Sequence, residues 1–264
     1  MDMETEIDIL IPAINNSYFT CSLINSIKNH TKIPFKIIYI DNGSEVSEFN
    51  NVVTSLENID HLIIRNDKNL GFVKAINQGL KLSQAKYICF QNNDTLVFNN
   101  CFERLIFHLN NNQDAGIVSP IASAGGGKQG IEIITSSLNY EESEINKIDI
   151  YRSSHTEVND FLYKIFKRKA LEINRSLAFF SVVMPRKTFE EIGYLDERYG
   201  IGLFDDDDYC QRIISKDLKL LLALDVYVWH LASTTFKSMH SNNEFMKMLI
   251  DNQKIFQDKW KSEK

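Results

Sequence analysis

The chain has 264 residues, of which 44% are hydrophobic and 24% are charged, and its formal net charge is −6. That length fits one large α/β domain, or a domain with a short appendage, and allows a substantial buried core. The acidic balance argues against a nucleic-acid-binding protein that relies on a broad basic face. Four cysteines lie beside apolar residues without metal or redox spacing, so we predict buried free thiols at Cys21, Cys89, Cys101 and Cys210.

The N-terminus and the apolar runs bear on where the protein resides. Met1 to Glu4 is acidic and precedes only a short apolar run, unlike the basic flank and longer apolar stretch of a signal peptide. No uninterrupted apolar stretch reaches the roughly 20 residues that a membrane span needs. We therefore expect a cytoplasmic protein with at most peripheral membrane contact.

The first 120 residues alternate between short apolar runs and segments with helical periodicity, which predicts a βαβ arrangement and a parallel sheet. The first apolar run stops at Pro12, where a buried strand would open into a loop. The expected strands are 6–12, 36–40, 61–65, 86–90 and 116–120, and the expected helices are 17–29, 47–56, 69–80 (after an initial turn) and 101–109.

The parallel pattern weakens after residue 120. We interpret 123–174 as a variable insertion, and the basic cluster Lys164 to Lys169 within it as the polar face of a helix, with phosphate contact as the alternative. Beyond it we expect strands at 177–184, 218–224 and 226–230, and helices at 187–192, 205–215 and 242–260. The last helix is amphipathic, and we expect it to pack on the domain, with self-association next and membrane contact third.

Four consecutive aspartates, Asp205 to Asp208, follow Phe204 and open a predicted helix. Carboxylates packed together raise one another's pKa unless a cation, a hydrogen-bonding ligand or a proton compensates. A solvated acidic turn that caps a helix is the simpler explanation, because aspartate is favoured at helix N-termini. The remaining motifs favour a binding site.

Polar turns follow the predicted strands, at the sheet edge where open α/β proteins bind ligands. Seven motifs occur in a fixed order between residues 7 and 236: the first strand with Pro12, the turn 41–44, the segment 69–79, the strand end 91–95, the segment 193–197, the acidic run and Trp229-His230. Together they resemble the inverting glycosyltransferases of family 2. The sequence looks closest to a rhamnosyltransferase-like branch, in which Asn-Asn-Asp replaces Asp-x-Asp.

The resemblance implies an α/β fold of the GT-A type: a single Rossmann-like nucleotide-binding domain with a mostly parallel central sheet and a C-terminal helical extension. We expect residues 1–240 to form this domain, with a nucleotide-binding half at 1–120 and an acceptor-binding half at 121–240. Residues 241–264 would then carry the C-terminal amphipathic helix.

The resemblance also implies roles for individual residues. Asp206 matches the catalytic base, Asp205 replaces a preceding glutamate, and Asp207 or Asp208 is the alternative base if the turn is shifted by one residue. Asp94 and His230 match ligands of Mn²⁺ or Mg²⁺, cations that accept carboxylate, imidazole and diphosphate donors. Asp41 would bind the base or ribose. Gly71 would allow close backbone approach, and Lys74 would face the diphosphate or solvent. The full donor-binding set is Pro12, Ala13, Asn15, Asp41, Asn42, Asn69, Gly71, Lys74, Asn77, Asn92 and Asn93.

The function that this resemblance implies is inverting transfer from a nucleotide diphosphate sugar, UDP-linked first and dTDP-linked next, to a hydroxyl of a glycan, glycolipid or glycoprotein. Asn92 and Asp205 depart from the family pattern, which keeps a second hypothesis open: a catalytically silent member that binds nucleotide or scaffolds a glycosylation complex. A nucleotidyltransferase is disfavoured, because residues 12–16 lack the glycine-rich basic loop that such enzymes carry after the first strand.

Overall fold

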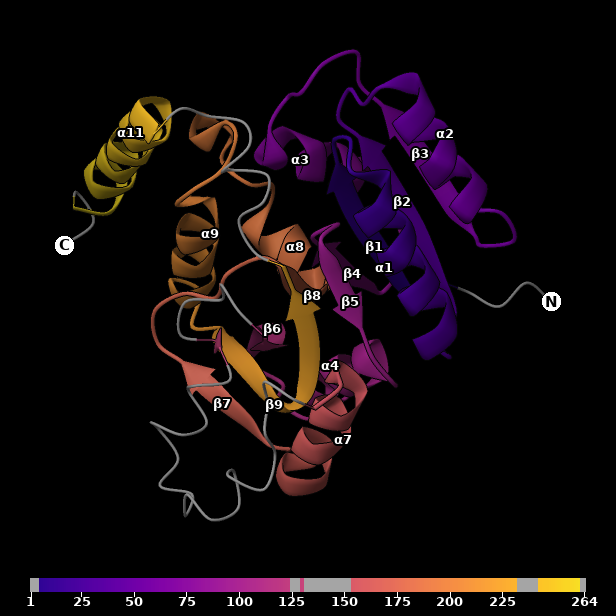
Figure 1. The fold of residues 1–264 in the computed structure, drawn as a ribbon. Coiled ribbons are helices and arrows are strands. Elements are labelled where there is room, and N and C mark those ends of the chain that lie inside the picture. The colour runs from indigo at the N-terminus through magenta and orange to yellow at the C-terminus, as the bar shows by residue number, and fades with distance from the viewer. Residues whose placement is uncertain (1–4, 124–128, 131–152, 232–241, 262–264) are drawn as a thin grey trace.

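A computed structural model describes residues 5–123, 129–130, 153–231 and 242–261. The described part contains a nine-stranded sheet in the order β3-β2-β1-β4-β8-β6-β9-β5, with β7 added against β9. Helices cover both faces of this sheet, as Figure 1 shows. The α/β class expected from the sequence is therefore confirmed.

The N-terminal half of the sheet is parallel, with β1 between β2 and β4 and with β3 at the edge. Side chains alternate along β1: Ile7, Ile9 and Ile11 pack in one core cluster, and Leu10 packs in the cluster on the other face. Burial on both faces explains why these strands read as continuous apolar runs. The elements are β1 (Ile7–Ala13), α1 (Ser17–His30), β2 (Phe35–Asp41), α2 (Val46–Ser55), β3 (His61–Arg65), α3 (Phe72–Leu82) and β4 (Tyr87–Gln91).

The C-terminal half of the sheet is mixed. β8 runs antiparallel to β4 and β6, while β9 runs parallel to β6 and antiparallel to β5 and β7. The parallel expectation thus holds for the half that begins the chain. The elements are β5 (Thr95–Val97), α4 (Cys101–Asn110), β6 (Ala115–Ala122), α7 (His155–Phe166), β7 (Ala170–Ile173), β8 (Ser181–Pro185), α8 (Arg186–Ile192), η2 (Glu197–Tyr199), α9 (Asp205–Ile214), β9 (Lys219–His230) and α11 (Asn242–Lys261).

One expectation for this half was wrong, and a second was incomplete. The two strands expected at 218–224 and 226–230 form one strand, β9, because Asp225 does not interrupt it: its carboxylate is buried 2.7 Å from His108 Nε2. The expected insertion contains α7 and β7, although 124–128 and 131–152 lie outside the described residues. A capping box between Ser154 and Glu157 was the missed sign of α7.

The C-terminal helix α11 packs on the domain, as the sequence favoured. Ile255 and Phe256 contact the core cluster that includes α3 and α9, and the Phe256 ring lies 5.7 Å from that of Phe204. Figure 1 shows α11 beside α9. No helix within the described ranges is long and apolar enough to cross a bilayer.

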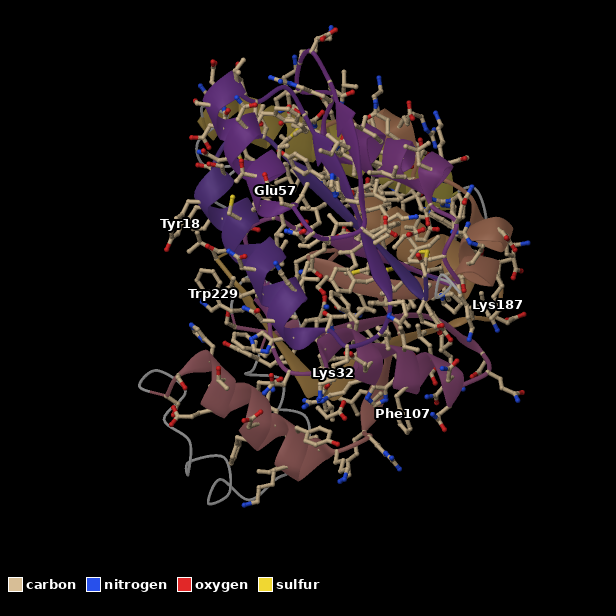
Figure 2. All side chains as sticks on the ribbon, turned by 90° about the vertical axis from the view of Figure 1, so that its right-hand side faces the viewer. Tyr18, Lys32, Glu57, Phe107, Lys187 and Trp229 are labelled. Atoms are coloured by element: carbon tan, nitrogen blue, oxygen red, sulfur yellow. The ribbon has the colours of Figure 1, made fainter. Side chains whose placement is uncertain are left out.

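The cysteines agree with the expectation of free thiols. All four are free; Cys89, Cys101 and Cys210 are buried and Cys21 is half-buried. Apolar side chains also reach the surface at isolated places, for example Tyr18 on α1, which Figure 2 shows pointing outward and which is 76% exposed.

Candidate functional site

A cavity of about 610 Å³ lies at the carboxyl ends of β1 and β4, where the sheet order switches direction. The amino end of α9 forms the opposite wall of this cavity. The residues that line the cavity are Pro12, Ala13, Ile14, Asn42, Asn69, Gly71, Phe72, Asn92, Asn93, Asp94, Ala178, Phe179, Phe180, Ile201, Gly202, Leu203, Phe204, Asp205, Asp206, Asp207, His230 and Leu249. Twelve of the residues that the sequence marked as site candidates are in this set. The outliers are Asn15, Asp41, Lys74, Asn77 and Asp208.

Asp41 and Asn42 end β2 but differ in surroundings. Asp41 is fully buried beneath the cavity, where it accepts from Ser44 N and Tyr39 Oη and lies 3.3 Å from Arg65 Nε. Burial, followed by the Asp41 charge, raises the pKa of Tyr39 above its usual range. Asn42 lines the cavity.

Asn42 also joins the turn after β2 to the segment that precedes α3. Its Oδ1 accepts from Asn66 Nδ2 and Leu70 N, and its Nδ2 donates to Asn69 Oδ1 and Gly71 O. An asparagine with both amide atoms engaged has a fixed orientation. The arrangement holds two cavity-lining segments, at 42 and 69–71, in one relative position.

Gly71 lies at the start of α3, and its backbone has φ +87°. A Cβ there would lie 2.6 Å from the carbonyl oxygen of Gly200, so only glycine fits between these segments. Lys74, on the next turn, is exposed and outside the cavity lining. Asn77 is buried and bonds the Leu195 backbone through both amide atoms, so it joins α3 to the segment that leads to η2.

Asn92, Asn93 and Asp94 follow β4 and reach the cavity directly. The short strand β5 pairs antiparallel with β9, with Thr95 opposite His230, and Leu231 N donates to Asp94 O. This pairing brings together residues far apart in sequence: His230 Nε2 lies 3.4 Å from Asp94 Oδ1. Both residues are more than nine-tenths buried.

The surroundings of His230 fit a metal ligand. The ring stacks on Phe180 at 5.1 Å, which fixes its plane, and among the described residues its buried Nδ1 has no hydrogen-bond partner. A carboxylate and an imidazole on the cavity wall are a donor pair that Mn²⁺ accepts. No group of three or more acidic, histidine or cysteine side chains gathers as a metal site in the described ranges, so diphosphate oxygens and water would complete the ligand set.

The acidic run divides between two environments. Asp205, Asp206 and Asp207 line the cavity, whereas Asp208 faces away from it. Asp208 is fully buried: Oδ2 accepts from Arg212 Nε at 3.1 Å, and Oδ1 accepts from Trp260 Nε1 at 3.0 Å and lies 2.7 Å from Lys259 Nζ. Three nitrogen donors, with the Tyr199 hydroxyl at 3.4 Å from Oδ1 as a longer fourth, therefore offset the charge at this end of the run.

Two of the carboxylates that line the cavity, Asp205 and Asp206, have raised pKa values. Burial, with the charges of Asp207 and Asp208, raises the pKa of Asp205 to about 6. Burial, with the charges of Asp205 and Asp207, raises the pKa of Asp206 well above its ordinary value. The amino end of α9 opposes these effects, because its backbone N–H groups favour negative charge. Carboxylates with such pKa values suit proton transfer near neutral pH.

The sequence did not mark the apolar walls of the cavity. Phe179 and Phe180 precede β8, the loop 201–204 precedes α9, and Leu249 comes from α11. Trp229 is absent from the lining, and its ring lies 5.7 Å from that of His155 of α7. Apolar residues in the lining give no sequence signal, because core residues have the same composition.

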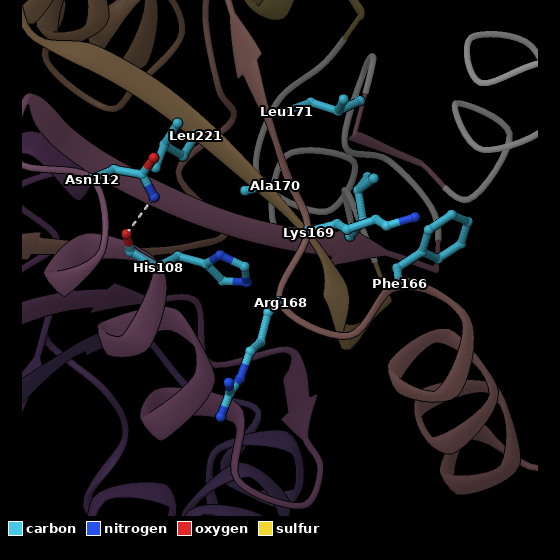
Figure 3. Close-up of a pocket in the computed structure, with 9 residues that line it drawn as sticks. His108, Asn112, Phe166, Arg168, Lys169, Ala170, Leu171 and Leu221 are labelled. Carbon is cyan, nitrogen blue, oxygen red and sulfur yellow. Dashed lines mark hydrogen bonds between the residues drawn. The ribbon is translucent and has the colours of Figure 1, made fainter.

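A second cavity of about 340 Å³ lies beside β7 and α4. Figure 3 shows Arg168 and Lys169 pointing away from each other at its edge. Arg168 packs over the Phe107 ring at 4.8 Å, and Lys164 and Lys167 are exposed. The basic cluster therefore combines the end of α7 with a turn, and its side chains do not converge on one point.

Taken together, the sheet order and the cavity at its switch point define an α/β fold with a ligand-sized cavity at the carboxyl ends of its strands. Residues 8–173, more than half of the chain, match the family described as Glycosyl transferase family 2. The chain belongs to this family, and its class is that of the glycosyltransferases.

Relatives agree with this class. A protein of Rickettsia bellii named "Uncharacterized glycosyltransferase" is 33% identical over 102 residues, which are 38% of this chain and 14% of that protein. The chain thus matches only a small part of this curated relative.

Solved structures show the fold. One of GalNAc-T7 with UDP, GalNAc and Mn²⁺ aligns with a TM-score of 0.63 at 14% identity, covering 87% of this chain and 44% of the other. One of the mannosyltransferase PcManGT from Pyrobaculum calidifontis with GDP-Man and Mn²⁺ aligns with a TM-score of 0.60 at 11% identity, covering 95% and 69%. The GT-A fold expected from the sequence is confirmed.

Proposed function

We propose that the chain is an inverting glycosyltransferase that moves a sugar from a nucleotide diphosphate sugar to an acceptor hydroxyl. The observation that carries this proposal is the meeting of two groups in one cavity: Asp94 with His230, and Asp205 with Asp206. The first pair suits a diphosphate with its metal, and the second suits proton removal. In the cell we expect a cytoplasmic enzyme.

The donor would lie along the carboxyl ends of β1, β2 and β4. Pro12 and Ala13 would provide backbone beside the base, and Asn69 and Asn92 line the same cavity with amide side chains. Asn42 would act by holding the segment 69–71 in place, because its own amide is fully engaged within the protein. UDP-sugars are our first expectation and dTDP-sugars the second. Of the two solved structures described above, one is with UDP and the other with GDP-Man, so GDP belongs in the test.

Asp94 and His230 would hold Mn²⁺ or Mg²⁺, which when bound neutralises charge on the leaving diphosphate. Asp206 would act as the base. The acceptor oxygen attacks the anomeric carbon as the bond from that carbon to the diphosphate oxygen breaks, and the hydroxyl proton passes to the Asp206 carboxylate. The electron pair of the broken bond leaves with the nucleotide diphosphate. Because the acceptor oxygen attacks from the face opposite the leaving group, the anomeric configuration inverts. The acceptor would be a glycan, a glycolipid or a glycoprotein.

Calorimetric titration with UDP, dTDP and GDP, each with and without Mn²⁺, tests the donor site. We expect one nucleotide to bind best and its affinity to fall without metal and in Asp94→Ala. Asp251→Asn, on the exposed face of α11, is the matched control for loss of a carboxylate. If no nucleotide binds, the proposal is wrong.

Turnover separates the enzyme from a silent family member. For the best nucleotide, release of the diphosphate from the corresponding sugar donor is measured for wild type, Asp206→Asn and Asp207→Asn. We expect Asp206→Asn to lose at least about a hundredfold, since general-base groups contribute about 10²–10⁴. Nucleotide binding without turnover in the wild type would favour the scaffold hypothesis, and a larger loss in Asp207→Asn would move the base by one residue.

A further inference from the structure

The loop 200–204, which leads into the acidic run, has an unusual backbone. Gly200 and Gly202 have positive φ, and so do two residues that are not glycine: Leu203 at 73° and Phe204 at 67°. Such conformations persist where the surrounding structure holds them, and they are common at functional sites. Because Asp205 follows directly, the loop determines where the first carboxylates of α9 enter the cavity.

Asn252 of α11 holds this loop. Its Nδ2 donates to the carbonyl oxygens of Tyr199 at 3.1 Å, Gly202 at 2.8 Å and Leu203 at 3.0 Å. Carbonyl oxygens only accept, so the amide nitrogen of Asn252 must face them, and its two hydrogens are shared among three acceptors. The residue is 5% exposed, so water would not readily replace these bonds.

The loop is held on its other side by the start of α3. Phe72 N donates to Ile201 O at 3.1 Å, and the missing Cβ of Gly71 lets the Gly200 carbonyl approach. The loop therefore lies between the predicted donor-binding segment and α11.

A second anchor fixes α11 beyond the acidic run. Lys259 and Trp260 both contact Asp208 Oδ1, at 2.7 Å and 3.0 Å, one residue after the cavity-facing carboxylates end. The Phe256 ring packs against that of Phe204 between the two anchors. Helix α11 thus contacts the loop before the cavity-facing carboxylates and the carboxylate of Asp208 after them. Leu249 of the same helix lines the cavity itself.

We propose that Asn252 is a positioning residue for the reaction, and that α11 sets the place of the general base as well as packing on the domain. This inference rests on the proposed function, because it requires Asp206 to act on a bound donor. It predicts that loss of the Asn252 amide lowers kcat and leaves nucleotide affinity unchanged, since Asn42, Asn92 and Asp94 lie on other elements.

The test uses the full chain and variants Asn252→Ala, Asn252→Asp and Gln253→Ala, the last on the exposed side of α11 as matched control. UDP-glucose, UDP-GlcNAc, GDP-mannose and dTDP-rhamnose with Mn²⁺ serve as probes. Water is the acceptor, so diphosphate release gives kcat and KM. Calorimetry with UDP, dTDP or GDP gives the Kd and the stoichiometry, which reports the folded fraction.

We expect kcat to fall at least about tenfold in both Asn252 variants, because displacing a catalytic group by about 1 Å costs on the order of a hundredfold. KM, Kd and a stoichiometry of one should match the wild type, which partial unfolding would not allow. If either variant does not fold, the second anchor serves instead: Lys259→Met should lower kcat and Lys259→Arg should restore it. Unchanged kcat, or kcat and Kd that worsen together, would refute the positioning role of Asn252 and leave the proposed function standing. Absence of wild-type turnover with every donor would overturn the proposed function and this inference with it.

Discussion

Replacing Asp208 by asparagine should destabilise the folded chain without directly removing a cavity group. The carboxylate is fully buried among Arg212, Lys259 and Trp260, whose nitrogens lie 2.7–3.1 Å from its oxygens. An amide of the same shape keeps one acceptor oxygen but turns an N–H₂ group toward donors, and it leaves two cations without their shared counter-charge.

The size of the loss in the free energy of unfolding depends on which partners Arg212 and Lys259 keep after the substitution. Breaking a buried ion pair costs about 3–5 kcal/mol. The Lys259 side chain is 22% exposed and keeps Asp196 at 3.1 Å, which favours the low end, whereas Arg212 has one buried Nη that bonds no described residue. We expect a loss of about 3 kcal/mol in the free energy of unfolding.

Urea denaturation followed by tryptophan fluorescence measures this loss at pH 7. The control is Asp251→Asn, which removes the same charge from the exposed face of α11 and should stay within about 0.5 kcal/mol of wild type. A loss below about 1 kcal/mol in Asp208→Asn would mean that the three donors do not depend on this carboxylate, and the division of the acidic run would be wrong.

Three further changes test other parts of the site. Gly71→Ala should lower the free energy of unfolding, measured in urea, more than Gly193→Ala does. Both glycines have φ above +80°, but a Cβ at Gly71 would meet backbone 2.6 Å away, whereas a Cβ at Gly193 would point into open space. Equal losses of stability in the two variants would contradict the close approach at Gly71. The free energy of unfolding of Asp205→Asn should rise relative to that of the wild type between pH 4 and pH 7, by on the order of 2–3 kcal/mol. The reason is that the wild-type carboxyl, whose folded-state pKa is raised from 3.8 to about 6, loses its stabilising contribution over that range. A difference between variant and wild type that does not change with pH would refute this explanation. His230→Gln should weaken nucleotide binding measured by calorimetry with Mn²⁺ and leave metal-free binding unchanged; equal weakening under both conditions would argue against a metal ligand.

Local patterns were enough to predict most of the framework. Continuous apolar runs and helical segments with period 3.6 depend on neighbours along the chain, so β1 to β4 and their crossover helices were predicted within a few residues. Polar turns after parallel strands must meet at one edge of the sheet, which is why residues 12–13, 42 and 92–94 line one cavity. Asp225 shows the limit of such patterns: a buried partner on α4 lets a charged residue continue a strand.

The amino-acid sequence by itself determined that four carboxylates crowd at the head of a helix and that a histidine ends a late strand. Only the tertiary structure decided which carboxylates face the cavity, because that depends on the rotation of α9 and on Lys259 and Trp260, about fifty residues further along the chain. It also decided that His230 lies beside Asp94, since strand pairing between β5 and β9 is a long-range contact. Chain-local preferences cannot encode such contacts; they form when distant elements bury their faces against one another.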